Sequence, residues 1–227
     1  QESKTWISWG THVFRSEESA VDAAKANILY DYLDDQIQNA IDHPGEDLYS
    51  KLLATEVDGK MMSEEEVKGV MILTFAGGRD TVINATSNAI AYFAEHPESL
   101  ERLRQQPELI KYTIEELLRY FSPLTHMGRV ATQDASICEH AIAANSRISL
   151  NWASANRDAS VFDKADEVVI DRKINPHVAF GFGTHNCLGA THARQIMKVL
   201  IHTLIDKVET IEIIDYEENI ENLGDYQ

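Results

Sequence analysis

The sequence AFGFGTHNCLGATHARQIMKVLI, from Ala179 to Ile201, joins a glycine-rich loop to a helical apolar pattern. The loop places Gly181, Gly183 and Gly189 around Cys187, one of only two cysteines in the chain. Glycine allows tight turns and a close approach of the backbone to a flat ligand. The apolar residues that follow recur with helical spacing; they are Ala193, Ile196, Met197, Leu200, Ile201 and Leu204. We therefore expect a tight loop that presents a thiol at the N-terminus of a helix.

The residues around Cys187 leave several interpretations of this thiol open. A thiolate binds metal ions, and the positive end of the following helix stabilises it by about 0.3–1 kcal/mol. A buried free thiol is the commonest state of an isolated cysteine. A zinc site formed by His185, Cys187 and His192 is a third alternative, although it lacks a fourth ligand. A phosphate-binding loop is disfavoured, because GFGTHNCLG matches neither of the known phosphate-binding fingerprints.

Composition excludes some classes of partner. The chain has 227 residues, 44% of them hydrophobic, and a net charge of −17. An acidic protein is a poor nonspecific ligand for nucleic acid or for an anionic membrane, so we expect neither partner. No apolar run reaches the ~18 residues of a membrane span, and the N-terminus does not resemble a signal peptide. Two cysteines make no disulfide framework and indicate a cytoplasmic protein.

Four segments are predicted to be helical. The first follows Ser16 and is stopped by HPG at His43–Gly45, with an apolar stripe of Val21, Ala24, Ile28, Leu33, Ile37 and Ile41. The second begins at a capping box formed by Ser63 and Glu66 and runs to Glu95. The third is Glu108–Phe121, and the fourth follows the cysteine loop. RISLNW and DEVVI, in the region 128–171, have strand-like composition. The fold class is therefore mostly α with minor β.

The spacing Phe180-x-x-Gly183-x-x-x-Cys187-x-Gly189 resembles the haem-binding signature of cytochrome P450. This resemblance implies that Cys187 is the axial ligand of the iron in haem b (iron protoporphyrin IX). His185 stands where many bacterial members carry a histidine. The other residues that the resemblance places against the porphyrin from this region are Phe180, Gly181, Gly189 and Ala193.

The long second helix is interrupted by polar and small residues at Gly77–Thr81. Each glycine inside a helix costs roughly 1 kcal/mol relative to alanine. The residues themselves fit a solvent-facing patch with a kink, or a widened helical turn beside a reaction centre. The segment resembles the oxygen-binding helix of bacterial P450s, which implies that Gly77 and Gly78 leave room for porphyrin and O2. It also implies that Thr81 donates a hydrogen bond on the oxygen side and that Asp80 helps to deliver protons.

Glu116 and Arg119, in TIEELLRYFSP, are three residues apart on one helical face. This face is opposite the apolar stripe of the helix, so periodicity predicts an exposed pair worth about 0–1 kcal/mol. The same residues resemble the Glu-x-x-Arg motif of the P450 family. That resemblance implies instead a buried structural pair beneath the segment that contains ANRDASVF and Arg172.

Arg129, in THMGRVA, allows two interpretations. By itself it is an ordinary exposed arginine of a strand. By resemblance it binds a haem propionate, with His185 as a second donor, because a guanidinium suits a carboxylate. The residues expected to border the substrate side of the haem are Leu73, Ala76, Leu124, Thr125 and Met127.

These motifs cover about Ser63–Leu204 in the order that the family has them. The chain therefore resembles the C-terminal portion of a soluble bacterial P450. We expect residues 1–227 to form a partial P450 domain that lacks the N-terminal half and the last C-terminal hairpin, as a fragment or a truncated gene product.

The resemblance implies a haem-thiolate monooxygenase that inserts one atom of O2 into a small organic substrate. Electrons would come from NAD(P)H through a ferredoxin-type carrier. Two alternatives remain: a non-catalytic or degenerate haem-binding fragment, and a small zinc-binding helical module.

Overall fold

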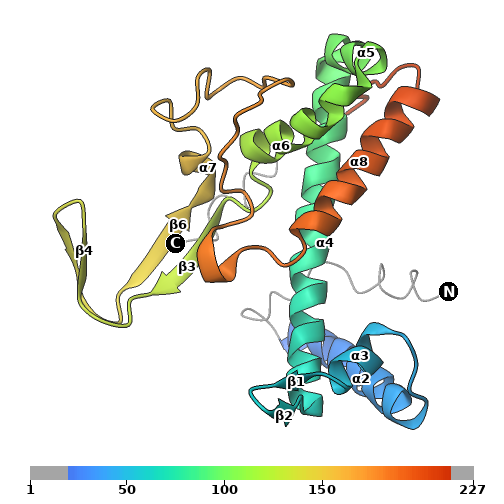
Figure 1. The fold of residues 1–227 in the computed structure, drawn as a ribbon, viewed down its shortest axis with the longest axis vertical. Coiled ribbons are helices and arrows are strands. Elements are labelled where there is room, and N and C mark those ends of the chain that lie inside the picture. The colour runs from blue at the N-terminus through green and yellow to red at the C-terminus, as the bar shows by residue number, and fades with distance from the viewer. Residues whose placement is uncertain (1–19, 216–227) are drawn as a thin grey trace. The chain divides into compact units, whose positions relative to one another are not determined.

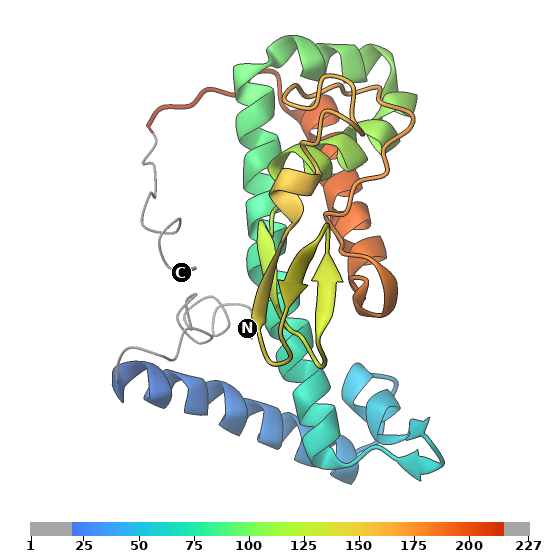
Figure 2. The same cartoon turned by 90° about the vertical axis from the view of Figure 1, so that its left-hand side faces the viewer.

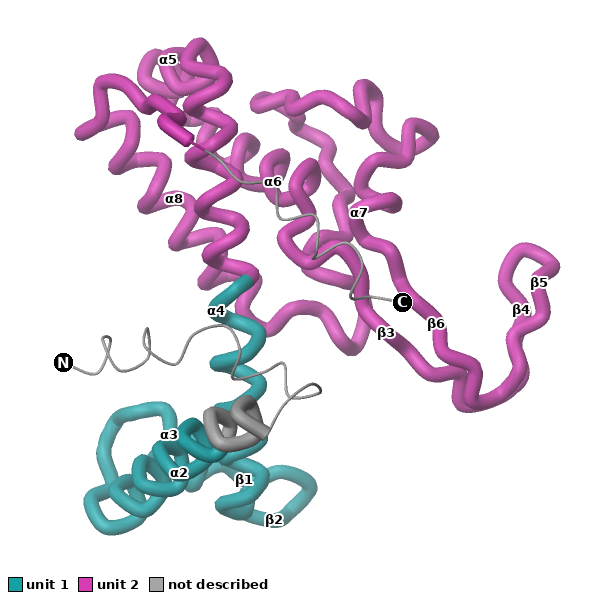
Figure 3. The backbone as a smooth tube through the Cα atoms, turned by 180° about the vertical axis from the view of Figure 1, so that it is seen from behind, with its two compact units in different colours: residues 1–80 teal, residues 81–227 magenta. Residues whose placement is uncertain are grey.

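The computed structural model describes residues 20–215, with side chains from residue 27 onward (Figure 1). The chain forms two compact units, one up to Asp80 and the other from Thr81 (Figure 3). The boundary falls inside one long helix, α4 (Glu64–Glu95), and each unit takes part of this helix into its own core. The described elements are mostly helical with short strands, which confirms the predicted fold class.

The first unit builds its core from α2, α3 and the N-terminal part of α4. Helix α2 spans Ala20–Asp42 and α3 spans Leu48–Leu53. The strands β1 (Glu56–Val57) and β2 (Lys60–Met61) form a small antiparallel hairpin before α4. The apolar residues that pack together in this unit are Leu29, Leu33, Tyr32, Tyr49, Met71, Ile72 and Phe75.

The apolar stripe predicted for the first helix is only partly right. Leu33 and Ile37 are buried, but Ile28 and Ile41 are 49% and 40% exposed, and Leu29 is buried instead of Ile28. Leu29, Leu33 and Ile37 repeat every four residues on one helical face, whereas Ile28 is rotated by about 100° from Leu29. The predicted start after Ser16, and the side chains of Val21 and Ala24, lie outside the described residues.

Helix α4 begins with the predicted capping box. The Ser63 hydroxyl oxygen accepts from the Glu66 N–H at 3.3 Å, and the Glu66 carboxylate accepts from the Ser63 N–H at 2.7 Å. The helix then runs for 32 residues to Glu95, as predicted. It stays α-helical through Gly77–Thr81, so the helix continues across both glycines. Regular turns on both sides propagate through the two glycines, because adding a residue to an existing helix is cheap.

The second unit packs the C-terminal part of α4 with three further helices (Figures 1 and 2). These are α5 (Pro97–Gln105), α6 (Ile110–Phe121) and α8 (Ala190–Lys207), and a short 3-10 turn, η2 (Pro107–Leu109), precedes α6. Residues with almost no exposure lie at the centre of the core; they are Ala89, Phe93, Leu103, Leu117, Met197 and Ile201. The fourth predicted helix is confirmed as α8, and three members of its predicted stripe are buried: Met197, Ile201 and Leu204.

Helix α6 starts two residues later than the sequence predicts. Glu108 belongs to the η2 turn, and the α-helix begins at Ile110. Pro107 opens that turn, since proline has no N–H to donate and fits the first position of a helical segment. At its other end α6 stops at Ser122, which has a left-handed φ of 41°.

Two antiparallel ribbons follow α6. Strand β3 (His126–Val130) pairs with β6 (Arg147–Asn151), which confirms the strand predicted in RISLNW. Between them, β4 (Ala135–Ile137) pairs with β5 (His140–Ile142). A short helix, α7 (Trp152–Ala155), continues from β6, and the chain then runs without helix or strand to the cysteine loop.

The strand predicted in DEVVI is wrong. Its backbone is hydrogen-bonded to side chains of α6 rather than to another strand: the Val169 N–H donates to Glu116 at 2.8 Å, and the Ile170 carbonyl accepts from Thr113 at 3.0 Å. Buried backbone groups need partners, and here charged and hydroxyl side chains supply them. β-Branched composition therefore did not lead to strand pairing.

We expect Ile201→Ala to lower the free energy of unfolding by about 2–5 kcal/mol, because the side chain is fully buried and its removal leaves a cavity. Val199→Ala, on the same helix but 56% exposed, is the matched control and should cost less than about 1 kcal/mol. Denaturant unfolding of both variants measures the difference. Equal losses would contradict the assignment of Ile201 to the core.

Candidate active site

The cysteine loop is closed by backbone hydrogen bonds. The Cys187 N–H donates to the Phe180 carbonyl at 2.8 Å, and a short 3-10 turn, η3 (Gly183–His185), lies between them. Gly181 and Gly183 have left-handed φ angles of 70° and 73°, which side-chain-bearing residues rarely adopt. The glycines thus allow the loop to return and to place Cys187 three residues before α8.

The structure presents Cys187 at the surface of its unit. The residue is exposed, so the buried-thiol interpretation is wrong. Its apolar neighbours Phe182 and Leu188 are 86% and 93% exposed. An exposed apolar surface around a thiol marks a contact face for an apolar partner or ligand.

The zinc interpretation is also wrong. Within residues 20–215, no three His, Cys, Asp or Glu side chains are grouped so that they could hold a metal ion. His185 and His192 are both exposed. A structural zinc site needs a closed set of ligands, and the loop offers one thiol.

The Gly77–Thr81 segment of α4 contains an unusual carboxylate. The Oδ1 atom of Asp80 is buried and has no hydrogen-bond partner among the described residues. A Cβ atom added at Gly77 or Gly78 would meet no described atom within 4 Å. On the same part of the helix, Leu73 is 72% exposed and Ala76 is half-buried. An unpaired buried oxygen calls for a functional explanation, since it costs free energy without a partner.

Glu116 and Arg119 form a fully buried ion pair, with side chains 0% exposed. Arg119 donates to both carboxylate oxygens of Glu116, from Nε at 2.9 Å and from Nη2 at 2.8 Å. Its remaining N–H groups donate to the backbone carbonyls of Asn156, Ala165 and Glu167 at 2.7–2.8 Å. All five donors of the guanidinium are therefore used.

Glu116 accepts further hydrogen bonds from outside its helix. They come from Arg172 Nε at 2.9 Å, Asn175 Nδ2 at 3.0 Å and the Val169 N–H at 2.8 Å. Burial by itself would raise the pKa of Glu116, but the hydrogen bonds from Arg119, Val169 and Arg172 outweigh it and lower the pKa below its usual value. The carboxylate thus stays charged at neutral pH.

The exposed pair that periodicity predicted is therefore wrong, whereas the burial implied by the family resemblance is what the structure has. The reason is tertiary. The residues after α7 cover this face of α6 and supply backbone partners to both charges. Helical periodicity identifies the apolar stripe of a helix, but it cannot predict that a distant coil segment covers the polar face.

The remaining predicted site residues of the second unit lie on β3, just before it, in the cysteine loop and, for Ala193, on α8. Arg129 is half-buried on β3 and donates to the Gly128 carbonyl at 2.8 Å. Leu124 is half-buried, Thr125 is exposed and Met127 is 41% exposed. Phe180 and Ala193 are partly buried, and Gly189 has the Cys187 sulfur 3.9 Å from where its Cβ would stand.

Sequence reasoning missed three polar residues that surround the loop: Glu115, His177 and Arg194. Glu115 accepts from Arg194 at 2.7 and 2.8 Å, and His177 Nε2 lies 3.0 Å from the same carboxylate. One signal was present, because Arg194 lies near the start of the helix that follows Cys187. Nothing in the sequence distinguished Glu115 from its neighbour Glu116, the glutamate of the Glu-x-x-Arg motif.

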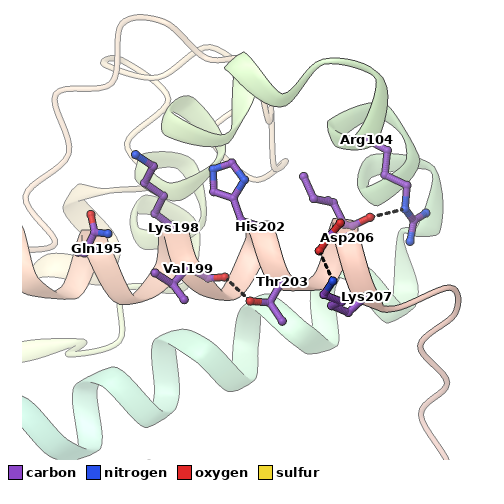
Figure 4. Close-up of a pocket in the computed structure, with 9 residues that line it drawn as sticks. Arg104, Gln195, Lys198, Val199, His202, Thr203, Asp206 and Lys207 are labelled. Atoms are coloured by element: carbon purple, nitrogen blue, oxygen red, sulfur yellow. Dashed lines mark hydrogen bonds and ion pairs between the residues drawn. The ribbon is translucent and has the colours of Figure 1, made fainter.

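Hollows of the second unit lie along α8. One, of about 680 Å3, is lined by Arg104 and by α8 residues from Gln195 to Lys207 (Figure 4). None of the predicted site residues lines it. A second hollow, of about 410 Å3, lies between α6 and α8 and includes Glu115 and Arg194. The thiol of Cys187 belongs to neither.

Comparison with known proteins identifies the family. The cytochrome P450 family model matches residues 11–108 and 104–215. The biotin biosynthesis cytochrome P450 of Bacillus subtilis (strain 168) is 38% identical over 186 residues, which are 82% of this chain and 47% of that protein. Linalool 8-monooxygenase of Pseudomonas putida is 36% identical over 75% of this chain and 42% of that protein. A solved structure described as a carbohydrate active P450 is 65% identical with a TM-score of 0.92, over 98% of this chain and 57% of that one.

The chain belongs to the cytochrome P450 family, whose members hold a haem iron through a cysteine thiolate. It spans about half the length of the curated relatives that it matches. Among the described residues, no helix combines the length and apolar character that crossing a membrane requires.

The cysteine loop fits a haem. The thiol of Cys187 is exposed, the apolar side chains of Phe182 and Leu188 beside it are uncovered, and the loop turns through glycines. A porphyrin is flat and apolar, so it suits such a surface, and a thiolate is a soft ligand for iron.

We expect Arg119→Met to lower the free energy of unfolding by about 3–5 kcal/mol, because it leaves the buried Glu116 charge without its bidentate partner. Arg147→Met, at an exposed position of β6, is the control and should change it by less than about 0.5 kcal/mol. Urea unfolding at pH 7 compares the two. A loss below 1 kcal/mol in Arg119→Met would show that the pair does not stabilise the fold.

Stability should fall in acid because of the carboxylates on α6. Burial raises the pKa of Glu115, but Arg194 and His177 outweigh it and bring the pKa down from 4.5 to about 2. A lowered pKa in the folded state means that the charged form stabilises the protein above pH 4.5, and that this contribution is lost as the pH falls towards 2. Glu115→Gln should therefore be less stable than wild type at pH 7 and lose less stability between pH 4.5 and 2. Parallel pH profiles of the two proteins would contradict this.

Proposed function

We propose that this chain carries the haem-thiolate half of a P450 monooxygenase, with residues 1–227 as part of one P450 domain. The observation that carries the proposal is the exposed Cys187 thiol in a glycine loop at the start of α8. In this proposal Cys187 is the axial ligand of haem b. The bound haem would supply the activation of O2 and the transfer of one oxygen atom to a small organic substrate.

The chain's own residues have separate roles in this proposal. Phe180, Gly181, Gly189 and Ala193 would form the surface that holds the porphyrin, and Arg129 and His185 would donate to its propionates. Glu116 and Arg119 are structural, because they hold the segment after α7 in place.

On α4, Asp80 and Thr81 are the proposed catalytic residues. The buried Oδ1 of Asp80 has no partner among the described residues, which supports a carboxylate that accepts and passes on a proton. The hydroxyl of Thr81 would donate a hydrogen bond on the oxygen side, and Gly77 and Gly78 would leave space there. By the family resemblance, the residues that would border a substrate are Leu73, Ala76, Leu124, Thr125 and Met127.

A carbohydrate is the first substrate class to test. The solved structure that is 65% identical to this chain is described as carbohydrate active, and this identity is far higher than that to the other P450s compared above. We further propose that electrons reach the haem from NAD(P)H through a ferredoxin-type carrier in the cytoplasm. The two free cysteines suit a reducing compartment.

The decisive experiment compares Cys187→Ser with Cys138→Ser after titration with haemin. We expect wild type and Cys138→Ser, whose cysteine is also exposed, to give the reduced-CO Soret band of a thiolate-bound haem. Cys187→Ser should lose that band, because a serine hydroxyl does not replace a thiolate as iron ligand. A Cys187→Ser protein that keeps the wild-type band would rule out Cys187 as the ligand.

A second candidate is a haem-binding chain without catalytic activity. Turnover of a carbohydrate panel by the haem-loaded chain with a ferredoxin and its reductase separates the two. The thiolate band without product would favour this second candidate.

A further inference from the structure

Glu115, the residue before the buried glutamate of α6, lies at the centre of a second polar cluster. Its carboxylate accepts two parallel hydrogen bonds from Arg194, Nε to Oε1 at 2.7 Å and Nη2 to Oε2 at 2.8 Å. His177 Nε2 lies 3.0 Å from Oε2. The partners of Glu115 are thus different from those of Glu116, so two adjacent carboxylates hold different parts of the chain.

His177 connects Glu115 to the backbone that leads into the cysteine loop. Its side chain is only 4% exposed, and its Nδ1 atom accepts from the Ala179 N–H at 3.2 Å. A neutral histidine that accepts at Nδ1 carries its proton on Nε2, which can then donate to Glu115. The imidazole therefore fixes the chain two residues before Gly181.

Arg194 connects Glu115 to the other side of the loop. It lies on α8, and its guanidinium stacks over the Phe180 ring at 4.5 Å from the centroid. The Phe180 carbonyl is the acceptor for the Cys187 N–H. One arginine thus contacts the residue to which the backbone of the cysteine is bonded.

We propose that Glu115 is a positioning residue for Cys187, acting through His177 and Arg194 on Phe180. The inference rests on the proposed function in one respect, that Cys187 is the iron ligand. A bidentate carboxylate–guanidinium pair fixes orientation as well as distance, and the stacked ring transmits this orientation to the loop. The described hydrogen bonds of Glu115 go to His177 and Arg194 and not to the thiol.

The exposure of the cluster argues for positioning rather than bulk stability. The side chains of Glu115 and Arg194 are 28% and 41% exposed, and ion pairs with this degree of solvent contact stabilise folds weakly. Loss of the pair should therefore mainly lower the free energy of local opening of the cysteine loop, which is separate from the free energy of global unfolding.

Hydrogen exchange of the whole chain, followed by mass spectrometry, tests the inference without haem. In Glu115→Gln we expect the peptide that covers residues 178–189 to exchange about tenfold faster, because hydrogen bonds to a charged acceptor are replaced by weaker neutral ones. Peptides of α4 and α5 should change much less, because a partly exposed pair contributes little to global stability. Glu101→Gln, which removes the partly exposed partner of Arg104, is the matched control and should leave the loop unchanged.

Arg194→Lys is the second variant, and it decides the test if Glu115→Gln does not fold. It keeps the charge but loses the paired N–H donors and the stacked plane, so the same peptide should exchange faster. An unchanged loop in a folded Glu115→Gln, or a uniform increase over the whole chain, overturns the inference.

The CO spectrum of the haem-loaded proteins is a second readout, which a purely structural role of Glu115 would not change. We expect Glu115→Gln to show a smaller share of the thiolate band on CO binding than wild type, and Glu101→Gln to show the same share. An equal share in Glu115→Gln overturns the inference. Absence of the band in wild type speaks against the proposed function, and hydrogen exchange then still decides the role of Glu115.

Discussion

The second unit depends on one buried ion pair, between Glu116 and Arg119. Each charge costs several kcal/mol to remove from water, and their mutual attraction compensates for this only when the remaining donors and acceptors are also bonded. Arg119 meets this condition with backbone carbonyls of a segment that has no strand or helix of its own. The shape of that segment is consequently set by the pair, and the segment leads directly into the cysteine loop.

Two adjacent residues of α6, Glu115 and Glu116, bind different segments near the cysteine loop. Glu116 holds the long coil through Arg172, Asn175 and the backbone, whereas Glu115 faces His177 and Arg194 on either side of the loop. A short helix can act on two regions because neighbouring side chains leave it about 100° apart. In our proposal, charges of α6 thereby position the thiolate ligand, although the thiol itself lies in the loop before α8.

The features that could be predicted are those with local causes. The capping box of Ser63 and Glu66, the 32-residue helix that follows it and the helix after Cys187 all come from spacing over a few residues. DEVVI was mistaken for a strand because its composition has that preference, while its backbone partners lie on a distant helix. The α6 pair was misplaced by periodicity for a related reason, since a coil distant in sequence covers its polar face.

The sequence by itself determined the helical class of the protein, the glycine loop around Cys187 and the family to which its motifs belong. Only the tertiary structure decided that Cys187 is exposed, that Glu116 and Arg119 are buried, and that Glu115 binds Arg194. The physical reason is that helix signals act through neighbouring residues, whereas burial and hydrogen-bond partners depend on what packs over a side chain from elsewhere in the chain.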